Sequence, residues 1–392
     1  MLKSTLQRRD VNLKEERQLI MLPGPTNVPD RVMRAMMKPI INHRGPEFEI
    51  LYDAIVNNLR YVFQTKNEAF VLTSSGTGSI ECAFSNVVES GDKVVVPVFG
   101  FFSEKLKEQV IRQGAKVIEV PVEWGDAPSA EQVEQVMKRE SNVKALALVY
   151  NETSTGATVR DIPKIGKITE ENNVLLIVDA ISILGGDMLP VDDWNIDICV
   201  AGSQKCLACP PGVSVISVSD KAWEAIKKKN RPYYFDLTMT REHSARKATP
   251  FTPALPVFYA LDEALRIIRE EGLENRFKRH ATCAEAFYNG FEALKFTIYP
   301  KRDVRSNTVI AVNVPSKVNC DRARQIMRER YKVITASGLG KLRELVFRIG
   351  CMGVISEAET LATINAFENT LADLNFPVDF GAGIEAARKV FS

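Results

Sequence analysis

The sequence predicts an α/β fold in which a large, mostly parallel sheet of seven strands is followed by a smaller α+β unit. From about residue 69, short β-branched apolar runs alternate with amphipathic segments of helical spacing. These runs are almost continuously apolar, as in the strands of a parallel sheet that helices cover on both faces. The alternation changes after residue 219, and a polar, proline-bearing stretch covers 229–256.

Seven apolar runs are expected to form the large sheet. They are AFVLT (69–73), KVVVPV (93–98), AKVIEV (115–120), KALALVY (144–150), VLLIVD (174–179), DICVAG (197–202) and VSVISVS (213–219). The segments 103–114 and 130–140 between them have the apolar spacing of helices that cover such a sheet. Because ligands of parallel sheets bind beyond the carboxyl ends of the strands, the residues that follow each run are the first candidates for a functional site.

The C-terminal part has fewer strands and longer helices. It begins with two helical patterns, one over 260–272 and one that continues to about 294. The elements expected after them are a strand at 308–314, a helix at 321–330, a strand at 345–350 and a last helix from about 356. We therefore predict an N-terminal arm over 1–20, a large domain over 21–262 and a small α+β domain over 263–392.

The composition is that of an ordinary globular protein with room for two domains. Of the 392 residues, 45% are hydrophobic, and 51 basic against 49 acidic side chains leave a formal net charge of +2. Such a balance favours neither nucleic acid nor an anionic membrane as a partner. No apolar stretch reaches the ~18 residues of a spanning helix, and charges occupy the N-terminus where a signal peptide would be apolar. We expect a soluble, cytoplasmic protein.

The seven cysteines are an odd number scattered through apolar segments, which predicts reduced thiols rather than disulfides. Cys206 and Cys209 have CxxC spacing, which is also found in metal sites and redox pairs. No second pair exists, and the three histidines lie far from this motif in the sequence. We therefore expect two small core-facing residues here and no metal site.

The segment SSGTGS (74–79) follows the first strand and opens a helix. Gly76 and Gly78 would let the backbone approach an anion while the N–H groups and the dipole of the helix point at it. The motif is neither GxGxxG nor GxxxxGK[ST], so it gives little support for a nucleotide. Two interpretations stay open, a phosphate site and a plain turn with a serine or threonine cap.

Two opposite charges end neighbouring apolar runs. Asp179 ends VLLIVD, where a carboxylate is unfavourable unless it meets a cation or caps a helix. Lys205, in GSQKCLACPPG (202–212), follows the next run and is either a surface lysine or a reactive amine. A phosphate cradle, a buried carboxylate and a strand-end lysine are the set that pyridoxal 5'-phosphate requires. A direct salt bridge would satisfy both charges, as would this cofactor lying between them, and the full set favours the cofactor.

Motifs along nearly the whole chain are similar to those of one enzyme family. They are PGPT (23–26), YVFQTKN (61–67), SSGTGS (74–79), NETSTG (151–156), VDAISILGG (178–186), GSQKCLACPPG (202–212) and RIGCMG (348–353). In this order they resemble the class V, fold-type I aminotransferases, and most of all the alanine:glyoxylate and serine:pyruvate enzymes. The resemblance implies a fold-type I architecture, pyridoxal 5'-phosphate as cofactor and transamination as the reaction.

The resemblance assigns the catalytic roles and the phosphate site. It makes Lys205 the Schiff-base lysine and Asp179 the partner of the pyridine nitrogen. The residues that it places at the phosphate are Ser75, Gly76, Thr77, Gln204 and, from a neighbouring subunit, Thr252. The position of Thr252 in the family implies a homodimer with shared active sites.

Further positions of the resemblance contact the ring or the substrate. Phe102 corresponds to the aromatic residue on one ring face, Ile181 to the β-branched residue under the other face, and Thr153 to the contact of the phenolic oxygen. Arg348 matches the arginine that grips the substrate carboxylate in a bidentate pair. The backbone of Gly24 is expected to approach the substrate.

Some positions depart from the family pattern. Thr249 replaces the usual tyrosine shortly before Thr252, and Thr77 stands where some relatives have histidine. The C-terminal segments also resemble pyridoxamine:pyruvate aminotransferase. Leu339 occupies the place of the second arginine of that enzyme, which argues against pyridoxamine as the substrate.

We therefore expect a ping-pong transaminase that moves an amino group from alanine or serine to glyoxylate or pyruvate through a Lys205 aldimine. Pyridoxamine:pyruvate aminotransferase-like activity is the alternative. A cysteine desulfurase of the same fold is disfavoured, because it would place a histidine over the cofactor and a cysteine in a late loop, where ITASGLGK (334–341) has none. A non-catalytic binding protein would be expected to lack the lysine or the aspartate, and both are present.

Overall fold

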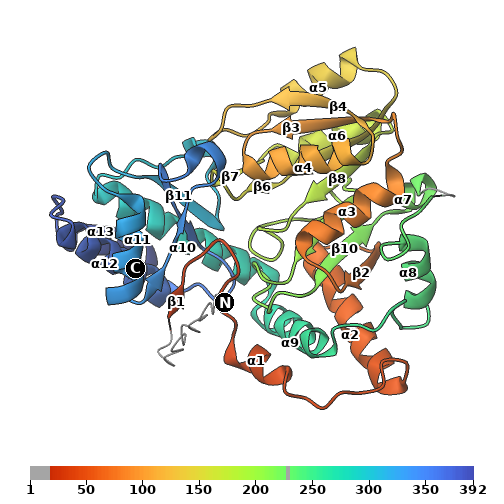
Figure 1. Ribbon diagram of the computed structural model, residues 1–392, viewed down its shortest axis with the longest axis horizontal. Helices are drawn as coiled ribbons and strands as arrows, with labels where there is room; N and C mark the ends of the chain where they lie inside the picture. Colours follow the sequence, from red (N-terminus) through yellow and green to blue (C-terminus); the bar gives the residue numbers. More distant parts are fainter. Residues whose placement is uncertain (1–17, 227–229) are drawn as a thin grey trace, which may run out of the picture.

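The computed structural model describes residues 18–226 and 230–392 (Figure 1). Two main sheets organise them, one of seven strands within residues 68–218 and one of three strands within residues 309–350. The predicted N-terminal arm lies outside the described residues except for 18–20. In this remainder Leu19–Ile20 form a short strand, β1, which pairs in parallel with β12 (Val333–Ile334). The start of the described chain therefore lies against the C-terminal part.

The seven-stranded sheet is mostly parallel, as the sequence predicts. In spatial order its strands are β2 (Glu68–Leu72), β10 (Ser214–Val218), β9 (Ile198–Gly202), β8 (Leu175–Asp179), β5 (Val143–Val149), β3 (Lys93–Val98) and β4 (Lys116–Pro121). Adjacent strands are parallel except that β10 runs antiparallel to both β2 and β9. Every residue of β8, β9 and β10 is buried, as in a sheet that helices cover on both faces.

Nine helices of the described chain belong to this part. They are α1 (Asp30–Ala35), α2 (Pro46–Phe63), α3 (Gly76–Val87), α4 (Phe101–Arg112), α5 (Ala130–Arg139), α6 (Ile162–Glu171), α7 (Asp220–Ala225), α8 (Leu237–Ser244) and α9 (Leu255–Glu271). Helices α3 and α4 contact each other and the central strands, α3 against β9 and β10 and α4 against β3 and β5 (Figure 1). Helix α2 packs with α9, and α5 packs with α6.

In helix α5 the local sequence determines both where the helix begins and which side faces the core. Ser129 Oγ accepts the N–H of Gln132 at 3.3 Å, and Gln132 Oε1 accepts the N–H of Ser129 at 2.9 Å. This reciprocal capping box fixes the first turn. The buried residues Ala130, Val133 and Met137 then repeat at intervals of three and four, so one stripe of the helix faces the core.

The C-terminal part is an α+β unit, also as predicted. Its antiparallel sheet has the order β11 (Val309–Asn313), β14 (Val346–Gly350) and β13 (Ala336–Ser337). Its helices are α10 (Leu273–Ala293), α11 (Cys320–Arg330), α12 (Glu357–Asp373) and α13 (Ala382–Phe391). The short elements of the fold are β6 (Asn151–Glu152), β7 (Ala157–Thr158) and two 3₁₀ turns at Arg302–Val304 and Gly340–Leu342. None of the helices in residues 18–226 and 230–392 is long and apolar enough to cross a membrane.

Each of the two main sheets has its own principal cluster of buried apolar side chains. The predicted domain boundary between residues 262 and 263 falls inside α9, whose buried side chains continue in the first cluster as far as Ile268. Gly272, with φ of +79°, separates α9 from α10. The division into 21–262 and 263–392 stays a prediction, and we propose Gly272 as the point where the chain passes between the two parts.

Phe291 lies at the centre of the second cluster, with the rings of Phe296 and Phe367 at centroid distances of 5.6 and 5.0 Å. Phe291→Ala should lower the free energy of unfolding by about 3–5 kcal/mol, because it leaves a cavity that the neighbouring rings cannot fill. Urea denaturation followed by circular dichroism measures the loss. Phe380→Ala is the control, at a side chain with 59% of its surface exposed, and should change that free energy by no more than about 0.5 kcal/mol. Equal losses in the two variants would contradict this account of the core.

Candidate active site

Two adjacent parallel strands carry the central charges of the site. Strand β8 ends at Asp179, and β9 ends three residues before Lys205. Because the two strands are parallel neighbours, their carboxyl ends lie at the same edge of the sheet. The turn with Lys205 is fixed by its own backbone, since the N–H of Ala208 donates to Lys205 O at 2.9 Å and the N–H of Cys209 donates to Ser203 O at 3.1 Å.

A cavity of about 200 Å³ opens at this edge. The predicted site residues that line it are Ser75, Gly76, Thr77, Phe102, Thr153, Asp179, Ile181, Gln204 and Lys205. They come from the starts of α3 and α4 and from the segments that follow β5, β8 and β9. The fold therefore gathers every predicted cofactor residue except Thr252 around one cavity, while the role of each residue stays a prediction.

Lys205 is held against the loop 23–25. Its Nζ donates a hydrogen bond to Pro23 O. A Cβ atom on Gly24 would lie 2.3 Å from Lys205 Cδ and 2.6 Å from Lys205 Nζ, and Gly24 has φ of +92°. Glycine is therefore required where this loop passes the lysine. Burial and, after it, the positive charge of Arg348 lower the pKa of Lys205 to about 8, so a neutral, nucleophilic amine forms near physiological pH.

Asp179 shows the opposite shift. Burial raises the pKa of its carboxyl to about 7, although the N–H of Ile181, which donates to Oδ1 at 2.8 Å, acts to lower it. Within the described part of the chain, the second oxygen Oδ2 receives no hydrogen bond. A carboxyl group in this state is suited to pair with a cationic N–H brought into the cavity.

The N-terminus of α3 forms one wall of the cavity. Ser75 caps the helix by accepting the N–H of Gly78 at 3.4 Å. The N–H groups of Gly76 and Thr77 have no acceptor among the described residues. A Cβ atom on Gly76 would lie 2.7 Å from Ile181 Cδ1, so the glycine also lets Ile181 pack against the helix start. Unpaired N–H groups at a helix N-terminus bind anions such as phosphate.

Glu152 is a buried residue beside the site that belongs to NETSTG (151–156) but for which the sequence predicted no role. Its Oε1 accepts the N–H of Phe102 at 3.1 Å and the hydroxyl of Ser154 at 2.6 Å, and its Oε2 accepts the N–H of Ser103 at 2.8 Å. The carboxylate therefore sits at the N-terminus of α4, where the helix dipole favours a negative charge. It fixes the start of α4, which carries Phe102, next to Thr153.

Arg348 lies on β14 beside this wall. Its Nε donates to Ser337 O at 2.8 Å, and its Nη1 donates to Thr153 O at 3.2 Å. The residue is 7% exposed, and no carboxylate of the described chain pairs with it. Burial lowers the pKa of Arg348 to about 10, so the guanidinium stays charged at neutral pH. A buried cation without an anionic partner is a natural site for the carboxylate of a small molecule.

Thr252 is not brought to this cavity by its own chain. It lies with Thr249, Tyr234 and Thr73 around a separate hollow of about 30 Å³. The hydroxyl of Thr249, which replaces the usual tyrosine of the resemblance, donates to Phe251 O at 2.8 Å. The contact of Thr252 with the phosphate of a neighbouring subunit stays a prediction.

A comparison of the whole sequence with known families decides the identity of this site. The pattern of the class-V aminotransferases matches residues 20–353. The chain is a class V aminotransferase. The family that the motifs predict is therefore confirmed, and so is the expectation of an enzyme.

The aminotransferase is similar to known proteins over nearly its full length. An uncharacterized aminotransferase of Methanocaldococcus jannaschii is 41% identical over 95% of this chain and 97% of that protein. A serine–glyoxylate aminotransferase of Methylorubrum extorquens is 36% identical over 95% of this chain and 95% of that protein. The solved ureidoglycine–glyoxylate aminotransferase of Bacillus subtilis is 31% identical, with 96% of this chain and 98% of that one covered and a TM-score of 0.91. The predicted fold-type I architecture is confirmed.

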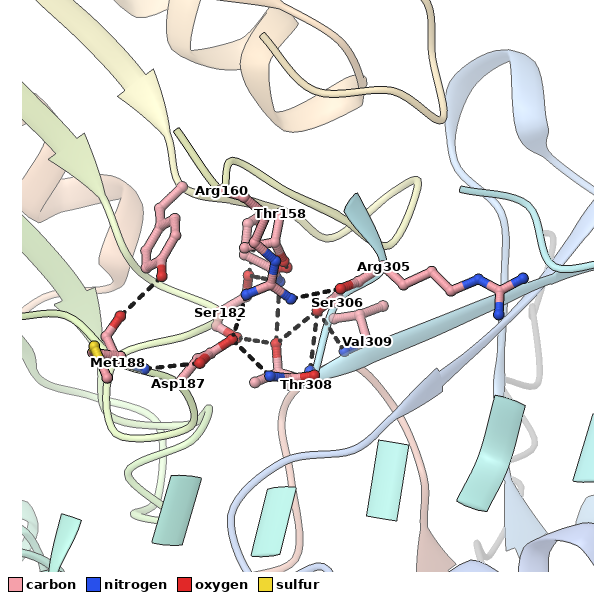
Figure 2. A network of polar contacts seen from close by, with 12 residues as sticks. Thr158, Arg160, Ser182, Asp187, Met188, Arg305, Ser306, Thr308 and Val309 are labelled. Atoms are coloured by element: carbon pink, nitrogen blue, oxygen red, sulfur yellow. Dashed lines mark hydrogen bonds and ion pairs between the residues drawn. The ribbon is translucent and has the colours of Figure 1, made fainter. Parts of the chain in front are cut away.

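Other polar residues of the aminotransferase line the cavity without having been predicted. They are Lys105, Gln109, Asn151 and Ser182. Asn151 Nδ2 donates to Ser182 Oγ at 2.8 Å and to Thr308 Oγ1 at 3.2 Å. Ser182 and Thr308 belong to the polar network of Figure 2. Asn151 lies just beyond β5, so the strand-end rule could have found it. Lys105 and Gln109 continue the helical spacing of Phe102 along α4, so periodicity could have found them.

The cysteines of the CxxC motif lie behind the lysine turn. All seven cysteines of the aminotransferase are buried and free. Burial raises the pKa of the Cys206 thiol to about 12, which keeps it protonated and unreactive. Across residues 18–226 and 230–392 no three side chains of the metal-binding types gather in one place. The geometry agrees with the core-facing interpretation of Cys206 and Cys209.

Gly24→Ala should lower kcat/KM of the aminotransferase by about tenfold or more, because the added methyl group occupies the space of the Lys205 side chain. Gly91→Ala is a matched control. Gly91 has the same φ of +92°, but a Cβ atom there has no neighbour within 4 Å. Both variants carry the left-handed strain of about 1–2 kcal/mol, whereas only the first displaces the amine. Steady-state kinetics and thermal melts separate the two effects, and an equal loss of activity in both would contradict the steric explanation.

Proposed function

We propose that this aminotransferase uses pyridoxal 5'-phosphate to move the amino group of alanine or serine to glyoxylate or pyruvate in two half-reactions. The observation that carries the proposal is the single cavity in which Lys205, Asp179 and the N-terminus of α3 meet. The names of the serine–glyoxylate and ureidoglycine–glyoxylate relatives support glyoxylate as an acceptor.

The residues of the cavity fit the cofactor. The unpaired N–H groups of Gly76 and Thr77 would hold its phosphate, and Asp179 Oδ2 would receive the N–H of its ring. Phe102 and Ile181 supply apolar walls of the cavity for the two faces of the ring. When bound, pyridoxal 5'-phosphate supplies an aldehyde that takes up the amino group and a protonated ring that withdraws electrons from the reacting carbon.

Three side chains would then move the proton, bind the substrate and balance the charge of the cofactor. Lys205 Nζ, whose pKa is lowered to about 8, is the base that takes the proton from the Cα atom of the amino donor. Arg348 binds the α-carboxylate of the substrate and so fixes Cα near that amine. Asp179, whose pKa burial raises to about 7, would be held in its negative form by a cationic N–H of the cofactor and would in turn favour that protonated form.

Lys205→Ala tests the proposal. It should lower turnover by about 10³-fold or more, since general acid–base catalysis alone contributes 10²–10⁴-fold, and it should remove the covalent attachment of the cofactor seen by visible absorbance. Lys247→Ala, at an exposed lysine paired with Asp53, is the control and should keep both properties. A Lys205→Ala variant with wild-type turnover would refute the assignment.

The donor is identified by the same assay with alanine, serine, glycine and pyridoxamine, each tested against glyoxylate and pyruvate. The proposal expects the highest kcat/KM for alanine or serine. A clear preference for pyridoxamine would instead establish the alternative activity, despite Leu339.

We also propose a homodimer with shared active sites. Thr252 is exposed and lies in a different hollow from the cavity of its own chain, as a residue that serves a partner would. Large apolar side chains are exposed along α1, its connection to α2 and the start of α2; they are Met33, Met37, Ile40 and Ile50. Exposed apolar side chains gathered in one region of the chain support a protein interface there.

Co-expression of two inactive variants tests the shared site. Thr252→Asp should repel the phosphate, and Lys205→Ala removes the amine, so each alone should have little activity. In a hybrid dimer with shared sites, one site contains both intact residues, and random pairing should restore about a quarter of wild-type turnover. If Thr252 serves its own chain, the hybrids stay inactive and the shared-site proposal is wrong.

A further inference from the structure

Arg276 is a buried arginine that does not line the cavity. Among the described residues, it forms no hydrogen bond with a side chain that is predicted to bind the cofactor or the substrate. It is in the first turn of α10 and is 2% exposed. Its Nη2 donates to Cys206 O at 2.6 Å, and its Nε donates to Gly185 O at 2.8 Å. Cys206 follows Lys205 directly, and Gly185 belongs to the segment that follows Asp179. One guanidinium therefore holds both backbone segments that carry the charges of the site.

A second arginine on the same helix holds the other side of the site. Arg279 Nη2 donates to Gly353 O at 3.1 Å, and Arg279 Nη1 donates to Ile355 O. These carbonyl groups follow β14, the strand with Arg348. Arg279 therefore anchors the segment that leads away from the substrate-binding arginine.

Glu271 joins the two arginines. Its Oε2 accepts Arg276 Nη1 at 2.7 Å, and its Oε1 accepts Arg279 Nε at 2.6 Å. Although burial acts to raise it, the pKa of Glu271 is lowered by the hydrogen bonds and charges of both arginines, so the carboxylate stays ionised. We call Glu271, Arg276 and Arg279 the α9–α10 clamp. The clamp surrounds Gly272, where the chain passes from the seven-stranded part to the three-stranded part.

Both guanidinium groups form hydrogen bonds with the carboxylate and with backbone carbonyl groups. Each combines an ion pair to the shared carboxylate with hydrogen bonds to two backbone carbonyl groups. Planar guanidinium groups fix the direction of such bonds, which a lysine at either position would not do. Removal of one partner leaves a buried charge or carbonyl unsatisfied, so the three residues are expected to respond as a unit.

A second set of polar contacts joins the same two parts of the chain on another side and supplies a comparison (Figure 2). Arg160 Nη1 pairs with Asp187 Oδ2 at 2.9 Å, and Arg160 Nη2 donates to Arg305 O at 2.6 Å. Asn307 Nδ2 also donates to Asp187 Oδ2 at 2.9 Å. Arg160 thus bridges the two parts as the clamp does, but it makes no contact with the Lys205 turn or with the segment after β14.

We propose that Glu271, Arg276 and Arg279 are positioning residues that couple the turn of Lys205 to the segment of Arg348. A displacement of either segment is transmitted to the other through the shared carboxylate. The inference rests on the proposed function for its catalytic consequence, whereas the mechanical coupling is a property of the fold alone. It follows that a change at Arg279, which touches only the Arg348 side and Glu271, alters the lysine turn.

Arg279→Gln in the cofactor-loaded enzyme is the decisive variant, because Arg279 is partly exposed and its loss leaves the core intact. Hydrogen exchange followed by mass spectrometry should show about tenfold faster exchange in peptides that cover 351–355 and also in those that cover 203–209. Faster exchange confined to 351–355 would overturn the proposal. Arg160→Gln is the matched control: it should accelerate exchange near 305–309, where it removes the hydrogen bond to Arg305 O, while Asp187 keeps its bond from Asn307 and 203–209 stays unchanged.

A carboxylate control separates the clamp from the rest of α9. Glu271→Gln should affect both clamped segments, because it leaves the buried guanidinium of Arg276 and the partly exposed guanidinium of Arg279 without their anion. The neighbouring Glu270→Gln, at an exposed residue paired with Arg31, should affect neither segment. Equal effects of the two substitutions would show that α9 responds generally and would contradict the clamp.

Kinetics then tests the catalytic consequence. Arg279→Gln should lower kcat for the amino donor and move the acid limb of the kcat/KM profile, which Lys205 sets because it acts as a base in its neutral form, and Arg279→Lys should recover the profile only in part. A rise in KM alone, with kcat and the profile unchanged, would refute the effect on Lys205. If the protein proves to use other substrates, the exchange measurements still decide whether the clamp couples the two segments.

Discussion

The burial of two opposite charges at neighbouring strand ends is the constraint on which the rest of the structure depends. The apolar strands β8 and β9 deliver Asp179 and Lys205 to one cavity, where low polarity favours the neutral form of each. Burial brings the pKa of Asp179 up to about 7 and that of Lys205 down to about 8. No ion pair joins the two within the described chain. Both charges are therefore left for a group that lies between them.

The polar groups around the cavity are arranged to keep these two residues in place without neutralising them. Lys205 donates to a backbone carbonyl, Pro23 O, rather than to a carboxylate, and Asp179 accepts a backbone N–H. Glu152 is a buried carboxylate near the cavity, and it accepts the N–H groups at the start of α4. Backbone partners orient a charged side chain while leaving its charge for the reaction. The chemistry of the site thus depends on loops whose own hydrogen bonds fix them.

The sequence predicts the parts of this structure that follow from periodicity and from strand ends. The seven strands, the α+β unit and the gathering of Asp179, Lys205 and the glycine loop 74–79 all follow from apolar runs and the residues directly after them. The antiparallel direction of β10 does not, because an apolar run has no direction of its own. The pairing of β1 with β12 is missed for a similar reason, since two residues carry no pattern and the partner is more than 300 positions away.

The residues that position the site were harder to predict than those that act in it. Glu152, Arg276 and Arg279 are charged residues of the kinds that usually face water. Their inward direction depends on where carbonyl and N–H groups of distant segments are left without partners, and that is known only after the chain is folded. Lys105 is an intermediate case, because its spacing from Phe102 along α4 places it on the cavity face once one residue of that face is known.

The balance of charge limits what this cavity accepts. Lys205 and Lys105 line the cavity and Arg348 lies beside it, bonded to Thr153 O, whereas Asp179 is the carboxyl group left without a full set of N–H donors. A neutral ligand would leave Arg348 buried without an anion, so anionic groups gain most from this site. On the proposed function, an amino acid and an oxo acid share the α-carboxylate that Arg348 would bind, so one arginine would serve both substrates. Selectivity among amino donors would then depend on other parts of the site. One such part is the loop around Gly24, whose backbone lies against the Lys205 side chain.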